Sequence, residues 1–291
     1  MKKSYCVLLA LTLLALSPMP GETAAKPESF RYQYSSDSDG VKARSIKISD
    51  EDSGEPLTHS VYYTQLSQTN RPSITEKTVV FKWVRPLQNQ GYLTLWAGYM
   101  KNDIRHFIPA AIMYNKEISD TQNVWISAGR ETVGTIAANE QGINRTSVSA
   151  SYQWKTGPAS AFTVSGDHWF YTDDNPEEKW QALYTHQLSS RLDVTAAYTY
   201  HTASTTHPGV YWVPQQEHTF SLAPRYTIPI GAGNLSLTFK KSLWARNTDG
   251  SIKQHEIKGT YQLGRFSASY SYLRDGDYTS RLYSADYQFF F

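Results

Sequence analysis

Groups that could carry out catalysis or bind a metal are the first residues to consider. None of the eight His residues forms a His-x-x-x-His spacing, and the single Cys excludes a Cys-x-x-Cys pair, so the common metal-ligand spacings do not occur. Asp167 and His168, near Asp173 and Asp174, are the best acid–base candidates. Adjacent residues of a strand point to opposite faces, so Asp167 and His168 cannot easily meet. We therefore expect no catalytic residue, no metal and no cofactor.

Three tryptophans favour the binding of a sugar. By the parity of their strand-like segments, Trp96, Trp169 and Trp244 fall on polar faces. An aromatic ring exposed inside a wet channel can stack on the apolar C–H face of a sugar ring. Two alternatives stay open: these rings lie in a membrane-interface girdle, or the register is off by one residue.

The polar faces of the same segments consist mainly of Ser, Thr, Gln and Asn, with charges of both signs. The charged positions are Lys155, Asp193, Glu217, Arg225, Lys240, Glu256, Lys258, Arg265 and Asp286. A selective ion pore carries rings of one sign. The mixture therefore predicts passage of an uncharged or weakly charged hydrophilic solute.

Segments of alternating polar and apolar residues must position these side chains. The alternation is clearest in residues 146–155, 181–188, 191–201 and 265–273, and less clean in residues 30–68. It is typical of strands with lipid on one side and water on the other. We predict an all-β fold, a single transmembrane antiparallel up-and-down β-barrel of about 16 strands.

The links between these segments alternate in length, as in up-and-down membrane barrels. The short links fall at 88–91, 156–158, 189–190, 231–233 and 264–265, and the longer polar stretches at 68–76, 130–144, 171–179, 202–216, 246–251 and 275–280. Residues 131–144 do not alternate and contain Gly134 and Gly142 without an amphipathic stripe. We expect them to form a long outer loop or a bent strand pair and not a helix.

The carboxyl-terminal strand has a distinctive pattern, in which Tyr283, Ala285, Tyr287, Phe289 and Phe291 share one face. This pattern resembles the last strand of bacterial outer-membrane β-barrels, where a final Phe after alternating aromatics is the insertion signal. The resemblance implies that Tyr287, Phe289 and Phe291 form an assembly signal for the barrel-assembly machinery, and that the last strand pairs with the strand around Phe30. The alternative is an edge strand of a soluble β-sandwich.

The amino-terminal residues and the composition agree with an outer-membrane location in a Gram-negative bacterium. Residues 1–25 read as a signal peptide, with Lys2 and Lys3 before a short apolar stretch, which leaves residues 26–291 as one barrel domain. Aromatic residues make up 14% of the chain, while its mean hydropathy is −0.51. The formal net charge of +2 excludes the strongly basic surface of a nucleic-acid binder. The expected partner is the outer-membrane lipid bilayer.

Two short elements stand out along the chain: residues 209–216, Gly-Val-Tyr-Trp-Val-Pro-Gln-Gln, and residues 125–133, Trp-Ile-Ser-Ala-Gly-Arg-Glu-Thr-Val. Both elements resemble segments in the barrels of bacterial exopolysaccharide (cellulose-type) secretion channels and their small stand-alone relatives. The resemblance implies exopolysaccharide export. Because the chain has no helical repeat before the barrel, the resemblance implies either a pore that works with a separate periplasmic scaffold or an accessory barrel. The resemblance also implies a set of candidate loop or mouth residues: Arg130, Tyr211, Trp212, Pro214 and Gln215.

The sequence is therefore compatible with three functions. The favoured one is a passive porin-like channel for a hydrophilic saccharide solute, driven from elsewhere because no phosphate-binding Gly-Lys-Ser/Thr loop occurs. The alternatives are a structural or accessory barrel without an open pore, and an outer-membrane barrel hydrolase. Within the link at 202–216, Tyr211 and Trp212 are expected either to gate the channel by stacking on sugars or to anchor the barrel in the headgroup layer.

Overall fold

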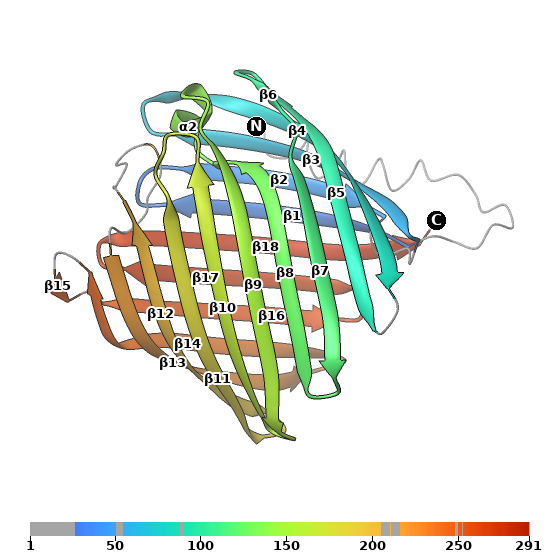
Figure 1. The fold of residues 1–291 in the computed structure, drawn as a ribbon, viewed down its shortest axis with the longest axis vertical. Helices are drawn as coiled ribbons and strands as arrows, with labels where there is room; N and C mark the ends of the chain where they lie inside the picture. Colours follow the sequence, from blue (N-terminus) through green and yellow to red (C-terminus); the bar gives the residue numbers. More distant parts are fainter. Residues whose placement is uncertain are drawn as a thin grey trace, which may run out of the picture.

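The protein is a single antiparallel sheet closed into a barrel, as the computed structural model in Figure 1 shows. The structure describes residues 27–50, 55–87, 90–204, 210, 216–247, 250–251 and 253–290. The signal peptide at residues 1–25 lies outside the described residues and stays a prediction.

The first half of the barrel consists of β1 (Pro27–Asp37), β2 (Lys42–Ser49), β3 (Leu57–Gln68), β4 (Arg71–Leu87), β5 (Gly91–Asn102), β6 (His106–Phe107), β7 (Ala110–Ser119), β8 (Gln122–Thr132), the helix α2 (Ile136–Glu140) and β9 (Asn144–Gly157). The second half consists of β10 (Ser160–Tyr171), β11 (Glu177–Ser189), β12 (Leu192–Ala203), β13 (Gln216–Ile230), β14 (Gly233–Asn247), β15 (Gly250–Ser251), β16 (Gln254–Leu263), β17 (Phe266–Asp275) and β18 (Tyr278–Phe290).

The strands pair in chain order until the last meets the first. Within the described residues, β6 and β15 are two-residue pieces beside β5 and β14, and the other strands form a closed 16-stranded barrel. β18 pairs with β1, with Phe289 opposite Glu28 and Tyr287 opposite Phe30, and Figure 1 shows these two strands side by side. The predicted fold class, strand number and closing pair are confirmed.

The two ends of the barrel differ in their links. We call the end with both chain termini and the short turns the turn end, and the opposite one the loop end. The predicted short links all lie at the turn end. At the loop end, the prediction of long links at 68–76 and 275–280 is wrong, because the links there are the two-residue turns 69–70 and 276–277. Their polar residues continue the paired strands, and Asn70 and Gly276 adopt the positive φ that such tight turns require.

The two faces of the sheet are opposite in character to those of a water-soluble barrel. Large apolar side chains lie exposed on the outside, for example Phe81, Ile112, Phe239 and Leu243, at 45–57% exposure. The inward positions between them carry mostly small polar residues. An outer face of this kind is suited to lipid and an inner face of this kind to water. None of the helices in the described part of the chain is long and apolar enough to span a bilayer.

The link between β8 and β9 contains a short helix, which corrects the expectation of a loop or bent strand pair at 131–144. Thr135 caps α2, because its side-chain oxygen accepts a hydrogen bond from the backbone N–H of Ala138 at 3.2 Å. Gly142, with a φ of +71°, reverses the chain after the last turn. Thr135 before the helix and Gly142 after it are residues typical of helix ends, and an analysis of strand parity does not take them into account.

The carboxyl-terminal strand generates a testable prediction. Phe289 faces outward at the turn end, with its ring centroid 6.4 Å from that of Tyr287. We expect Phe289→Ser to lower the amount of heat-modifiable barrel in the outer membrane several-fold, because Phe289 belongs to the predicted assembly signal.

The matched control is Phe266→Ser. Phe266 faces outward on the neighbouring strand, opposite Tyr287 and so two residues away from the level of Phe289, and its replacement removes the same kind of side chain from the lipid-facing surface. Equal losses of folded protein from the two variants would show that Phe289 contributes only lipid contact and no assembly signal.

Candidate functional site: the lumen and its mouth

Hydroxyl groups form much of the inner wall. Ser and Thr side chains on neighbouring strands bond to each other at 2.8–3.1 Å in four inward-facing pairs: Ser45 with Thr64, Thr185 with Thr195, Thr227 with Ser236, and Ser269 with Ser284. These side chains are short and leave the interior of a 16-stranded barrel open to water. These four pairs thus make their parts of the wall hydrophilic with short side chains.

Charged residues on the inner wall often lie next to a residue of opposite charge. The Arg225 Nε donates to Asp193 at 2.8 Å, the Arg145 Nε donates to Glu131 at 3.0 Å, and Arg31 bonds to Asp286. These pairs join inward-facing positions of adjacent strands. The pairing keeps the average potential of the lumen mild, as the mixture of signs in the sequence indicated.

One cavity of about 440 Å³ lies against the wall formed by β2–β8. Its volume falls in the range of about 300–1,000 Å³ that is typical of small-molecule sites. Tyr62 and Trp96 supply aromatic surface, and Lys47 and Lys82 supply charge. The cavity is also lined by Thr64, Glu76, Thr78, Val80, Thr94, Met100, Phe107, Pro109, Met113, Glu131 and Thr132. It therefore combines stacking surfaces with hydrogen-bonding groups.

The link that contains α2 folds across the mouth of the barrel at the loop end. Ile136 is buried against Leu66 of β3 and Ile74 of β4. On the other side, Ala138 and Ile143 are buried against Tyr171 of β10 and Ala203 of β12. The segment that links β8 to β9 thus contacts strands on both sides of the β8–β9 hairpin: β3 and β4 on one side, β10 and β12 on the other. We call residues 133–143 the mouth loop; they narrow the entrance above the cavity.

Arg105 holds the mouth loop in place. Its guanidinium donates to the side-chain oxygens of Asn139 and Asn144 and to the backbone carbonyl of Ile143, each at 3.0 Å. Burial lowers the pKa of Arg105, and the carboxylate of Glu76 opposes that shift. An arginine stays protonated under such a shift. The loop is therefore bound by a charged donor, which makes these hydrogen bonds strong.

Further contacts fix the same loop. Arg71 forms an ion pair with Glu140, and the Gln68 side chain accepts a hydrogen bond from the backbone N–H of Ala137 at 3.2 Å. The Thr135 hydroxyl donates to the backbone carbonyl of Val210, in the link between β12 and β13. The mouth loop is thus connected to the longest link at the loop end.

Two of the three predicted tryptophans face inward. Trp96 lines the cavity, and Trp169 packs against the mouth-loop cluster, with the Arg145 guanidinium 5.7 Å from its ring centroid. The expected inward position of Trp244 is wrong. A β-bulge shifts the register between Phe220 and Ser221 and pairs Trp244 with Phe220 on the outer face, because a bulge changes the face of every later residue.

The other predicted mouth residues fall into two groups. Arg130 is exposed near the loop end of β8, with its guanidinium 5.1 Å from the ring centroid of Phe107, which lines the cavity. Tyr211, Trp212, Pro214 and Gln215 lie outside the described residues, as does Phe291, so their roles stay predictions. Sequence parity did not single out Lys47 and Tyr62, because residues 30–68 alternate less cleanly, and it did not single out Lys82 of β4.

The acid–base candidates do not form a catalytic group. Asp167 faces the lumen, whereas His168 faces outward, where its Nδ1 lies 3.0 Å from Glu178. Ser160 and His186 bond at 2.7 Å on the outer face. However, no carboxylate is bonded to His186 among the described residues, so the orienting group of a catalytic triad is missing there. No metal-binding cluster of three or more His, Cys, Asp or Glu residues occurs in the described ranges.

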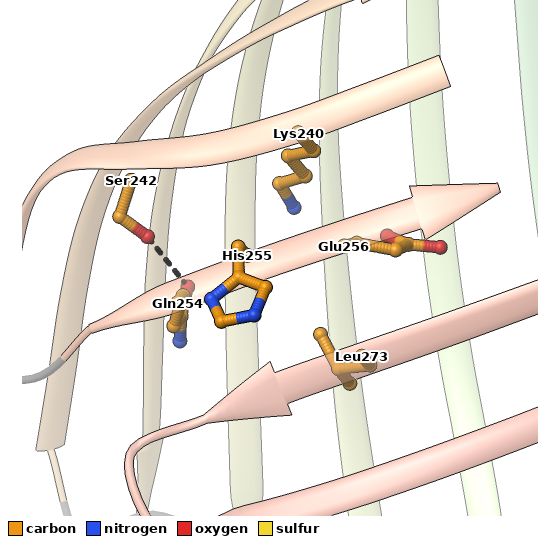
Figure 2. A pocket seen from close by; sticks show the side chains of 6 residues that line it. All are labelled: Lys240, Ser242, Gln254, His255, Glu256 and Leu273. Atoms are coloured by element: carbon orange, nitrogen blue, oxygen red, sulfur yellow. Dashed lines mark hydrogen bonds between the residues drawn. The ribbon is translucent and has the colours of Figure 1, made fainter. Parts of the chain in front are cut away.

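Figure 2 shows a small crevice on the inner wall at β14, β16 and β17. Lys240 and Glu256 occupy opposite positions of neighbouring strands there, and Ser242 donates to Gln254 at 3.3 Å. Its volume of about 10 Å³ is just enough for one water molecule. The crevice is therefore too small to enclose a sugar ring.

The mouth loop leads to a prediction about conductance. Removing the guanidinium in Arg105→Ala leaves its acceptors without a charged donor, at a cost of about 1.5–3 kcal/mol for each bond. We expect the loop to leave the mouth more often, with the open-to-closed ratio rising by roughly tenfold or more. Single-channel recordings in planar bilayers measure that ratio directly.

Arg274→Ala is the control, because Arg274 also lies at the loop end but donates to the backbone of its own turn, at Gly276. If both variants behave like the unaltered barrel, the mouth loop does not limit conductance.

Comparison with known proteins supports the fold. The sequence matches no family model and no curated protein. Among solved structures, the chain is similar to a bacterial polysaccharide outer membrane secretin, with a TM-score of 0.69, 13% identity, and coverage of 91% of this chain and 98% of that one. It is also similar to CdiB from Acinetobacter baumannii, with a TM-score of 0.57, 8% identity, and coverage of 91% of this chain and 60% of that one.

At these identities the likeness concerns the fold alone. The closed barrel and its lipid-facing outer surface agree with it. The chain therefore has the fold of a bacterial outer-membrane β-barrel, a closed 16-stranded antiparallel sheet with an apolar outer surface.

Proposed function

We propose that this barrel is a passive channel for a hydrophilic saccharide, acting in exopolysaccharide export. The observation that carries the proposal is the cavity at β2–β8, where Trp96 and Tyr62 lie on the same wall as four threonine side chains. Sugars present apolar C–H faces to aromatic rings and hydroxyls to polar groups, and this wall offers both. The likeness in fold to a polysaccharide outer membrane secretin supports the same function.

The driving force must come from outside the barrel. A closed sheet with paired backbone groups is rigid, and the sequence has no phosphate-binding loop. We infer that a gradient or a separate periplasmic scaffold of the export system supplies the direction of transport.

A second candidate is a structural or accessory barrel without an open pore. The observation in its favour is the mouth loop, whose Ile136 and Ala138 are only 1% and 0% exposed inside the entrance. The two candidates differ in conductance. Purified protein in planar bilayers should show discrete conductance steps if it is a channel, and no steps with the unaltered protein or the Arg105→Ala variant would establish the closed barrel.

The saccharide part of the proposal predicts the effect of Trp96→Ala. The ring contributes about 0.5–1.5 kcal/mol of stacking, so its removal should weaken current block by maltotriose by about two- to tenfold. Half-blocking concentrations in the same bilayer assay measure this effect.

Trp154→Ala is the control, because Trp154 lies on the outer face of β9 and is 46% exposed there. An unchanged maltotriose block in Trp96→Ala, with normal heat-modifiable barrel, would exclude stacking on Trp96 as a source of sugar affinity.

A further inference from the structure

We propose that the outer surface of the barrel at the loop end binds the phosphate groups of a phosphorylated lipid in the outer leaflet of the membrane. This inference concerns the lipid-facing surface and does not rest on the proposed channel function. The residues that carry it are three cations on β2 and β18, which we call the rim cluster: Lys42, Arg44 and Arg281.

The register of the sheet brings these three cations together. Arg281 of β18 and Lys42 of β2 are both opposite Ser36 of β1, on its two sides. Neighbouring strands lie about 4.8 Å apart, so about 10 Å separates the backbones of β18 and β2. Arg44 lies two residues nearer to the turn end, opposite Tyr34 of β1. Long side chains from all three positions can therefore converge on one anionic headgroup.

The rim cluster faces away from the lumen. Lys42 and Arg44 share the strand parity of Ile48, and Arg281 shares that of Tyr283. Ile48 and Tyr283 are exposed members of the lipid-facing surface. The three cations are exposed as well. The cluster can therefore contact groups outside the barrel and not a solute inside it.

Tyrosines indicate the depth of the cluster in the membrane. The Arg44 guanidinium lies 5.8 Å from the ring centroid of Tyr34, and the Arg281 guanidinium lies 6.0 Å from that of Tyr272. Tyr34 is in turn opposite Tyr283, with 6.0 Å between their ring centroids. Outward-facing tyrosines of membrane barrels concentrate where the hydrocarbon meets the lipid headgroups. The rim cluster therefore lies at the level of the headgroups.

Positive charge predominates on this part of the outer surface. Lys241 of β14 and Arg274 of β17, both opposite His255 of β16, extend it along the neighbouring strands. On the outer face of β14, β16–β18, β1 and β2, the described residues include one carboxylate, Glu28, and it lies at the turn end. An anion at the loop-end rim is therefore attracted.

The carboxylates near the cluster leave it positive. Asp39 and Asp277 lie beyond the strands, in the β1–β2 and β17–β18 turns. Asp37 faces the lumen, and its Oδ1 accepts a hydrogen bond from the backbone N–H of Val41 at 2.9 Å. In the part of the chain that the structure describes, none of the ion pairs includes a member of the rim cluster.

A phosphate that belongs to a lipid fits these observations. An arginine guanidinium binds phosphate through two parallel N–H···O bonds, and each cation near a membrane surface adds attraction for anionic lipid. The loop end faces the exterior, because the termini and short turns of such barrels are periplasmic. The acyl chains of an outer-leaflet lipid can also pack on Ile48 and Tyr32, which are exposed below the cluster. Soluble phosphate lacks that contact, so the lipid is the favoured source.

The test is calorimetric titration of the detergent-solubilised full barrel with lipid A that carries two phosphates. We expect this lipid to bind, and its dephosphorylated form to bind roughly tenfold more weakly. Lys42→Ala together with Arg281→Ala should weaken binding of the phosphorylated lipid by about thirtyfold. Lys42→Arg together with Arg281→Lys keeps both charges and should retain binding.

The matched control is Arg85→Ala together with Lys116→Ala. It removes one arginine and one lysine from outward positions of β4 and β7 at the turn end. Heat-modifiable migration confirms that each variant assembles. An equal loss of lipid binding in the control would show a general effect of charge and overturn the inference.

Two other results would overturn the inference with the unaltered barrel alone, whether or not the variants assemble. One is equal binding of the phosphorylated and dephosphorylated lipids. The other is binding of inorganic phosphate as tight as that of lipid A, which would assign the cluster to a soluble anion. Neither result involves conductance, so the channel proposal is tested separately.

Discussion

Closure of the sheet is the constraint on which the other features of this protein depend. Lipid offers no hydrogen bonds, so every backbone N–H and C=O group of a membrane-spanning strand must be paired within the protein. The antiparallel register between β1 and β18, from Pro27 opposite Phe290 to Asp37 opposite Ser280, removes the two free edges. Once the sheet is closed, its outer face must be apolar and its inner face encloses water, so the strand pattern follows from one requirement.

The packed interior of the described structure lies at the mouth and not along the barrel axis. The short Ser and Thr side chains of the inner wall leave space there, and the mouth loop occupies part of it with Ile136, Ala138 and Ile143. Hydrogen bonds from Arg105 tie this apolar cluster to its surroundings. The mouth loop is therefore held against the barrel wall both by apolar packing and by charged hydrogen bonds.

The chemistry of the lumen depends on position as much as on composition. The inward charges have both signs, and many are paired across strands. The wall of β2–β5 nevertheless places Lys47 and Lys82 beside Tyr62 and Trp96. A lumen whose inward charges have both signs thus contains one wall where ammonium groups and aromatic rings lie on neighbouring strands.

The amino-acid sequence by itself determined the class of fold, the strand number and the closing strand, because alternation and turn residues are local and are read along one strand at a time. Tertiary structure decided the rest of the site. A bulge turned Trp244 outward, an N-cap Thr135 and Gly142 allowed a helix where a loop was expected, and Arg105 met Asn139 across the mouth. The cavity is lined by side chains from seven strands, β2–β8, and the register between strands decides which of these side chains become neighbours. That register is set by the closure of the whole barrel and by its bulges, so no single segment of sequence contains it.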